Sequence, residues 1–414
     1  MIRPPLLLAA RLSALLAALL ATLLTALLTA LLAPTLALAA DRDPARVEAD
    51  RLTTRAAARG AEAGGAVDLI RLAELADWIP HGELPARLRA AATDRRRAPL
   101  VRAVAWWLLR EDALARLDAP TAAEAAAALG LLDGFALRIG GAPHPTAALE
   151  AGPWQPWPRG AGAGELWLES ILRPDREVTA TAVTRLVSPT GGPAVLRLGY
   201  DDAATVWLNG DEVFAADATH PAWLDQVAIP VVLRPGDNRL VVELRQRDGA
   251  WRLIARVTDP KGDPLPVQSH PDPWGEVPAP AEGERPDAEA IAHLWTALYA
   301  AAETDPPVAA DLRDMADYAR VTGLPDADQA LPRVAIEGAW ATEPSPRTLR
   351  AWLRILPEGE QARVQSGHAP ARPIEEADHW SDLDRQTAAA WTHYHARRHG
   401  EARRAVEAIL AHAP

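Results

Sequence analysis

The sequence predicts an α+β protein of several domains, in which an antiparallel β-sandwich of jelly-roll type lies between two helical regions. Three observations support this prediction. Apolar residues recur at helical spacing before residue 133, short alternating segments fill residues 134–268, and helical spacing returns in residues 286–414. The length of 414 residues favours two or three domains, each with a core of its own.

Residues 1–39 are expected to be a signal peptide. An apolar run from Leu6 to Ala33 follows an early arginine, and Ala37-Leu38-Ala39 supplies the small residues of a cleavage site. The run is longer than the usual signal core of about 7–15 residues, so an uncleaved anchor is the alternative. We expect cleavage and an exported protein, periplasmic, secreted or at the cell surface, without membrane contact afterwards.

Charge and cysteine content exclude several classes of function. The formal net charge of -12 disfavours nucleic acid as a partner, because phosphate binding requires a basic face. The chain has no cysteine, which excludes disulfides, thiolate metal sites and a cysteine nucleophile.

Residues 40–133 are predicted to form a small helical region. The segments VDLIRLAELADWI (67–79) and LVRAVAWWLLREDALARL (100–117) place apolar residues three and four positions apart. Thr121 is the expected N-cap of the last helix, with Glu124 three residues later.

Residues 134–268 are predicted to form the β-sandwich, because short β-branched or alternating segments are separated by Gly, Pro, Asp and Asn. One of them contains a hairpin, TVWLNGDEVF, in which Asn209-Gly210 predicts a two-residue turn with positive φ at both positions. Val206 and Leu208 then share one face and Trp207 the other. The eight predicted strands lie within GFALRIGG, GELWLESIL, REVTATAVTRLV, PAVLRLGY, ATVWLNGDEVF, VAIPVVL, NRLVVELRQ and WRLIARVTD.

Alternation within NRLVVELRQ also assigns the faces of its strand. Leu240, Val242 and Leu244 are predicted to face the core, with arginines and a glutamate on the opposite side.

Residues 269–285 are rich in proline and acid, which predicts a semi-extended linker. Beyond it, residues 286–414 contain helical patterns in pairs. Paired helices of this kind are typical of a repeat array, in which each pair buries its apolar stripe on the next.

Two parts of the chain resemble known families. LESILRPDREVTATAVTRLVSP, AVLRLGYDDAATVWLNGDEVF and DQVAIPVVLRPGDNRLVVELRQRDGAWRLIARVTDPKGDPL follow one another between about Gly134 and Leu265. In this order they resemble the galactose-binding-like β-sandwich of secreted bacterial proteins. Gly199 and Gly210 are expected to relax backbone limits at its turns. The segment AAAWTHYHARRHGEARRAVEAILAHAP is similar to tetratricopeptide helices.

Both modules occur in the N-terminal part of exported transglutaminase-like proteins, and similar sandwiches decorate family 2 glycoside hydrolases. The resemblance implies a binding module. It does not carry over a cysteine-dependent activity, because the chain has no cysteine.

The resemblance and the loop residues suggest a carbohydrate site. Trp223 and Tyr200 are placed to stack on a sugar ring, and Asp201, Asp202 and Asp225 to hydrogen-bond its hydroxyls. The alternative is that the aromatic residues only pack and the acids only cap turns.

Two places in the sequence carry residues of the kind that bind metal ions. A calcium ion on the sandwich rim is one candidate, with Asp201, Asp202 and Asp211 as the nearest acids. His395 and His399 stand four residues apart, the spacing of two ligands on one helix face, but no third ligand is evident. We expect no resident cofactor, and no catalytic motif is present.

The sequence therefore predicts an exported, non-catalytic binding or scaffold protein that engages a protein partner through its C-terminal helices. The sandwich would orient these helices or bind a glycan. One alternative is a carbohydrate-binding accessory protein. Another is a truncated relative of an exported transglutaminase-like enzyme, with the catalytic half missing or encoded separately.

Overall fold

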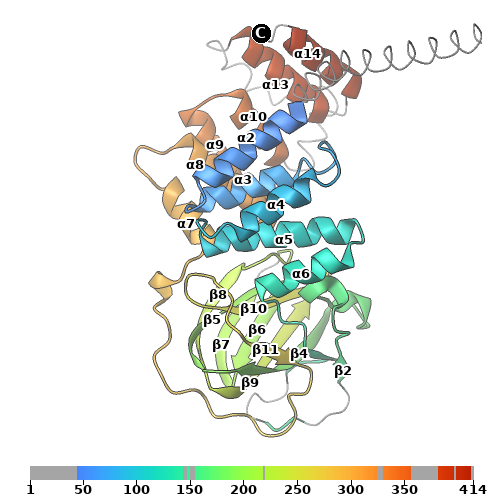
Figure 1. Ribbon diagram of the computed structural model, residues 1–414, viewed down its shortest axis with the longest axis vertical. Coiled ribbons are helices and arrows are strands. Elements are labelled where there is room, and N and C mark those ends of the chain that lie inside the picture. Colours follow the sequence, from blue (N-terminus) through green and yellow to red (C-terminus); the bar gives the residue numbers. More distant parts are fainter. Residues whose placement is uncertain are drawn as a thin grey trace, which may run out of the picture.

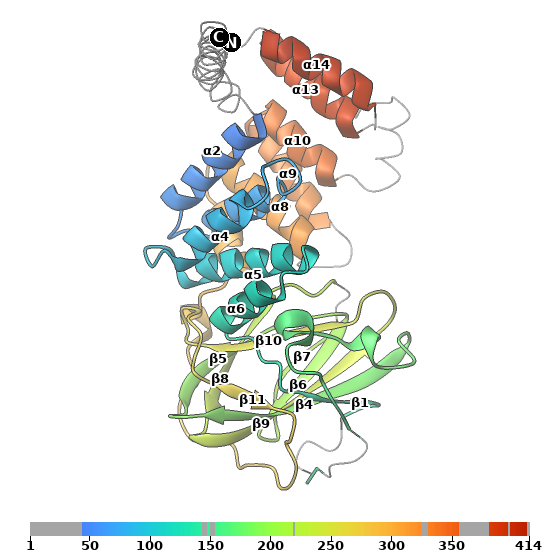
Figure 2. The same ribbon diagram turned by 45° about the vertical axis from the view of Figure 1, so that its right-hand side comes forward.

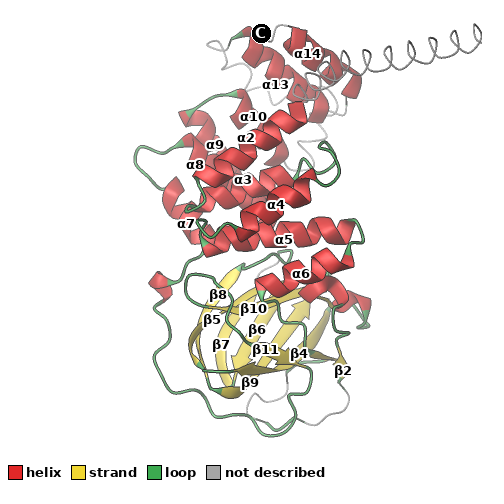
Figure 3. Ribbon diagram, viewed as in Figure 1, coloured by secondary structure: helices red, strands yellow, loops and turns green. Residues whose placement is uncertain are grey.

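The computed structural model describes residues 44–142, 147–149, 154–217, 220–323, 330–355, 381–395 and 398–411. The predicted signal peptide lies outside these residues. The protein has an α+β fold, with helices gathered at one end of the molecule and two open antiparallel sheets at the other (Figures 1 and 3). Within the described ranges, no helix is long and apolar enough to cross a bilayer.

The N-terminal helices form the first part of the helical end, and proline begins two of them. Pro99 stands in the first turn of α5, where a missing backbone N–H is tolerated. The predicted cap at Thr121 is wrong. The last helix begins at Ala119, and the carboxylate of Asp118 accepts the Thr121 N–H at 3.2 Å. The helices are α2 (Pro44–Ala58), α3 (Ala63–Ala73), α4 (Glu83–Thr93), α5 (Pro99–Ala115) and α6 (Ala119–Leu129).

The strands form two sheets, which we call the β-unit. The larger sheet has the order β2-β1-β4-β9-β6-β7, with β11 also on β4, and the smaller has the order β3-β10-β5-β8. The strands are β1 (Ala136–Ile139), β2 (Gln155–Pro156), β3 (Glu165–Trp167), β4 (Val178–Ser188), β5 (Gly192–Tyr200), β6 (Ala203–Leu208), β7 (Asp211–Asp217), β8 (Val227–Leu233), β9 (Gly236–Gln246), β10 (Arg252–Thr258) and β11 (Gln268–His270).

The predicted hairpin forms between β6 and β7. Leu208 pairs with Asp211, so Asn209 and Gly210 make a two-residue turn, with φ of 52° and 89°. The buried side chain of Asn209 also donates to Asn238 at 2.9 Å and accepts the backbone N–H of Arg239 at 2.8 Å. These bonds connect the hairpin to the start of β9.

The core of the β-unit lies between its two sheets. Leu240, Val242 and Leu244 are fully buried there, as predicted, together with Val206. Gly199 lies inside β5 and not at a turn, so its predicted role is wrong. A Cβ at this position would come 1.9 Å from the carbonyl oxygen of Trp223, and glycine is needed for that close approach.

The segment predicted as a semi-extended linker packs along the β-unit. β11 pairs with β4, and Gly275 exchanges two backbone hydrogen bonds with Leu149. Arg239, on the outward side of β9, is buried because its guanidinium donates to the carbonyl oxygens of Gly275 at 2.6 Å and Glu276 at 3.0 Å. The segment is therefore anchored to the β-unit at β11 and at Gly275.

The C-terminal helices pack against the N-terminal ones. Leu52 and Leu69 share one hydrophobic cluster with Leu298, Met315 and Ile336. The two helical regions are thus one body, which we call the helical layer (α2 to α5 and α7 to α10; Figure 2). The C-terminal helices are α7 (Leu294–Ala302), α8 (Ala309–Thr322), α9 (Ala330–Thr342), α10 (Pro346–Ile355), α13 (Asp382–His395) and α14 (His399–Ala411).

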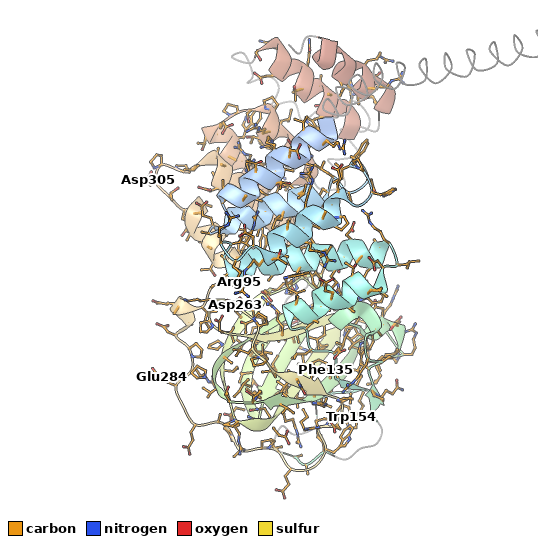
Figure 4. All side chains as sticks on the ribbon, in the orientation of Figure 1. Arg95, Phe135, Trp154, Asp263, Glu284 and Asp305 are labelled. Atoms are coloured by element: carbon orange, nitrogen blue, oxygen red, sulfur yellow. The ribbon has the colours of Figure 1, made fainter. Side chains whose placement is uncertain are left out.

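The helical layer is fastened to the smaller sheet of the β-unit. Arg110 of α5 is fully buried, donates to the Ala163 carbonyl at 2.7 Å and pairs with Glu165 at 3.0 Å. Arg102 of the same helix pairs with Asp263, which lies at the boundary of the two parts in Figure 4. The outward face of this sheet is therefore covered by the helices.

Candidate functional site

The two aromatic residues predicted to bind sugar do not form an exposed platform. Tyr200 is 2% exposed, and its ring packs on Phe214 and His220 at centroid distances of 5.9 and 4.9 Å. Trp223 is half-buried under the helical layer, with its ring edge-to-face against Trp107 of α5 at 6.1 Å. Stacking on a sugar requires an open aromatic face, which Tyr200 lacks.

Asp225, the third predicted residue, is paired inside the protein. Its carboxylate accepts Arg256 Nε at 2.8 Å and a second bond from the same guanidinium. The backbone carbonyl of Asp225 also contacts His293 Nε2 at 3.1 Å. Asp225 therefore acts in the joint between the β-unit and the helical layer, and its carboxylate is not presented to solvent.

Asp201 and Asp202 lie side by side at the end of β5, and both are buried. Asp202 accepts the backbone N–H of Arg247 at 2.8 Å. Burial and the adjacent Asp202 raise the pKa of Asp201 to about 8. Asp201 therefore keeps its proton at neutral pH.

This proton predicts a dependence of stability on pH. The unfolded Asp201 carboxyl has a pKa near 3.9, so between about pH 4 and 8 the folded state binds a proton that the unfolded state does not. Stability should fall across this window as pH rises. Asp201→Asn imitates the protonated acid, and we expect it to reduce the loss between pH 5 and 8 by roughly 1–3 kcal/mol in urea titrations. Asp211→Asn, at the exposed hairpin, is the control, and an equal pH slope in both variants would contradict the assignment.

The acids considered for calcium do not converge. Asp211 begins β7 at the opposite end of β6 from Asp201 and Asp202. Among the described residues, no group of three or more His, Cys, Asp or Glu side chains is placed to hold a metal ion. The predicted histidine pair is also separated, because α13 ends at His395 and α14 begins at His399.

A pocket of about 90 Å³ lies within the helical layer, where its two halves meet. Four helices line it, and three of them do so through residues three or four positions apart, which share one helix face. The lining residues are Glu48, Arg51, Leu52 and Arg55 from α2, Arg71 and Leu75 from α3 and its end, Ala310, Arg313, Asp314 and Asp317 from α8, and Arg347, Arg350, Ala351 and Arg354 from α10.

The pocket has a surplus of positive charge, with seven arginines and three carboxylates in its lining. Each of the three carboxylates already pairs with an arginine. Glu48 is held by Arg51 at 2.6 Å, while Asp314 and Asp317 each lie 2.7 Å from Arg71. Burial raises the pKa of Glu48, but its bond to Arg51 and the charges of Arg51, Arg350 and Arg347 lower it by more. Three further arginines of the lining pair with carboxylates outside it: Arg55 with Asp68, Arg313 with Glu343 and Arg354 with Glu74.

Arg347 and Arg350 act on nearby carboxylates through their charge but hold none of them directly. Neither makes an ion pair within 4 Å among the residues that the structure describes. The Arg350 guanidinium lies 4.1 Å from the ring centroid of Trp391, and its Nε is shielded from solvent with no hydrogen-bond partner in the described part of the chain. Burial and the neighbouring Arg354 lower the pKa of Arg350.

Sequence reasoning did not identify this pocket. A local signal existed, because PRTLRAWLRI places Arg347, Arg350 and Arg354 on one face and the buried Leu349 and Leu353 on the other. The partners of this face lie about 300 residues earlier, on α2 and α3, and no spacing rule connects them.

Comparisons with known proteins do not assign the chain. No family model matches it, and no curated protein matches it at a significant level. Among solved structures, a GH31 alpha-xylosidase from Xanthomonas citri is similar over 34% of this chain and 15% of its own, with 16% identity and a TM-score of 0.21.

Proposed function

We propose that this protein is an exported, non-catalytic binding protein whose helical layer engages a protein partner. In this proposal the β-unit is a galactose-binding-like sandwich that supports the layer, and the C-terminal helices are tetratricopeptide-like. The close packing of α8 on α9, and of α13 on α14, favours the second assignment.

The distribution of exposed apolar side chains carries the proposal. Such side chains are enriched where proteins bind one another, although single ones are common on any surface. Of the large apolar residues that are exposed in the described ranges, all but Ile139 belong to the helical end: Val47, Trp78, Leu117, Tyr299, Val308, Val334 and Val406. This distribution supports a partner site on the helices and not on the β-unit.

A photo-crosslinking experiment tests this function. We expect a photoreactive amino acid in place of Val334, which is 64% exposed on α9, to give a discrete adduct in producing cells. The same substitution at Asp211, on the exposed hairpin of the β-unit, is the control and should give none. Adducts of equal yield from both positions, or none from Val334, would argue against a partner on the helical layer.

Carbohydrate binding by the β-unit is the second candidate. Its support now comes from Trp154 and Trp274, which are half-buried with ring centroids 6.1 Å apart, at the end of the β-unit away from the helices (Figure 4 labels Trp154). Aromatic faces at this end are free of the helical layer. Glycan-array binding that survives unchanged in Trp154→Ala would remove this site.

A further inference from the structure

The pocket between α2, α3, α8 and α10 has the composition of an anion site in a protein that is otherwise acidic. The chain carries a formal net charge of -12, whereas the pocket lining gathers seven arginines, of which Arg347 and Arg350 form no ion pair among the described residues. Like charges gathered in a partly enclosed site repel one another, and desolvation makes this repulsion stronger than at an open surface. A bound anion would relieve it.

We propose that this pocket binds an oxyanion, the phosphate or carboxylate group of a small ligand. Guanidinium groups present several N–H donors in a planar fork that matches the oxygen atoms of both groups. The site does not depend on the protein partner proposed above, because its ligand needs only the chain itself.

Arg350 is the central donor of the site. Trp391 lies against its guanidinium plane and fixes its orientation, which lowers the entropic cost of ligand binding. Its Nε–H is shielded from water and makes no hydrogen bond among the described residues. A buried donor without an acceptor is costly, and a ligand oxygen would supply the acceptor.

Arg347 lies one turn before Arg350 on α10 and is exposed. It therefore stands at the mouth of the pocket, where its charge attracts an incoming anion. Arg51, Arg71 and Arg354, in contrast, already hold Glu48, the α8 carboxylates and Glu74. The arginines available to a ligand are thus Arg347 and Arg350.

The volume of the pocket limits the ligand. A cavity of roughly 150 Å³ holds a benzene molecule. The 90 Å³ found here fits a smaller group, such as one phosphate or carboxylate, and does not fit an extended chain. The rest of a larger ligand would project past Arg347.

Calorimetric titration of the purified full-length chain tests the proposal. Sodium phosphate and sodium citrate are titrated separately, with ionic strength held constant by sodium chloride. We expect saturable binding of at least one anion. Binding of phosphate alone would identify a phosphate ligand, binding of citrate alone a carboxylate ligand, and binding of both a general oxyanion site.

Two variants connect the binding to the pocket. Arg347→Gln and Arg350→Gln should each weaken binding by about tenfold or more, because each removes a charged donor. Arg96→Gln, which removes an equally charged side chain that is 90% exposed outside the pocket, is the control and should bind like the original chain. Because Arg347 is exposed, its variant is expected to fold normally. Absence of saturable binding with both salts, or unchanged affinity in Arg347→Gln, overturns the proposal.

Discussion

Asp225→Ala is expected to lower the free energy of unfolding by about 3–5 kcal/mol, the usual cost of removing one partner of a buried ion pair. Arg256 is 1% exposed and has Asp225 as its carboxylate partner. Arg256 also lies directly opposite Arg197 across β10 and β5, and Arg197 is equally buried. Without Asp225, two guanidinium groups would face each other away from water.

Chemical denaturation of the purified chain measures this loss. Asp217→Ala is the matched control, because Asp217 makes only exposed contacts with arginine and should change stability by less than about 0.5 kcal/mol. Asp225 was predicted to bind sugar. A variant as stable as the original chain would return Asp225 to that role and contradict the structural one.

The pH dependence of this contribution has a definite sign. Burial raises the pKa of Asp225, but the charge and hydrogen bonds of Arg256 lower it by more, so the folded value is below the ordinary one. The stability from Asp225 is therefore present above about pH 4 and is lost as pH falls through the lowered pKa. This is opposite to the trend expected from Asp201.

Arg71→Ala is expected to destabilise the protein by a similar amount, about 3–5 kcal/mol. Arg71, on α3, contacts Asp314 and Asp317 of α8 at 2.7 Å each, and Asp68 of its own helix at 3.4 Å. All three carboxylates are buried. Burial raises the pKa of Asp68, and the nearby Asp314 adds to this effect, while three arginines oppose it. Without Arg71, Asp314 would still pair with Arg59, but the nearest arginines to the buried Asp317 would lie 3.8 Å away.

Chemical denaturation measures the loss of stability, and native-state hydrogen exchange shows which helices are affected. Amides of α3 and α8 should lose protection together, although the two helices are more than 200 residues apart in the chain. Arg89→Ala is the control, because Arg89 pairs with Glu124 at the surface and should contribute less than about 1 kcal/mol. Unchanged amide protection of α8 in the Arg71→Ala variant would show that the N-terminal and C-terminal helices unfold independently.

The strands could be predicted because their signals are local. Alternation in NRLVVELRQ needs only neighbouring residues, and the Asn209-Gly210 turn is determined by the φ angles that its two residues accept. The bonds of Asn209 with Asn238 and Arg239, in contrast, join two turns about 30 residues apart. The sequence predicted both turns but not their connection.

The candidate site could not be predicted, for the same physical reason. Arg197 and Arg256 alternate with core residues, a pattern that predicts side chains facing solvent. The helical layer covers that face of the smaller sheet, however, and both arginines are buried. The sequence predicts Tyr200 and Asp225 to be loop residues that bind a ligand. In the structure, Tyr200 packs on His220, and the backbone of Asp225 contacts His293. The arginine pocket exists only after both ends of the chain have packed together.

The central claim is that α2 and α3 pack with α8 and α10 as one body that forms the arginine pocket. A double-mutant cycle of Arg71→Ala and Asp314→Ala tests it most directly, because it measures the interaction across that junction. We predict a coupling energy of at least about 1 kcal/mol, as found for charged residues in contact. Destabilisations that add to within about 0.3 kcal/mol would contradict the junction, and with it the pocket.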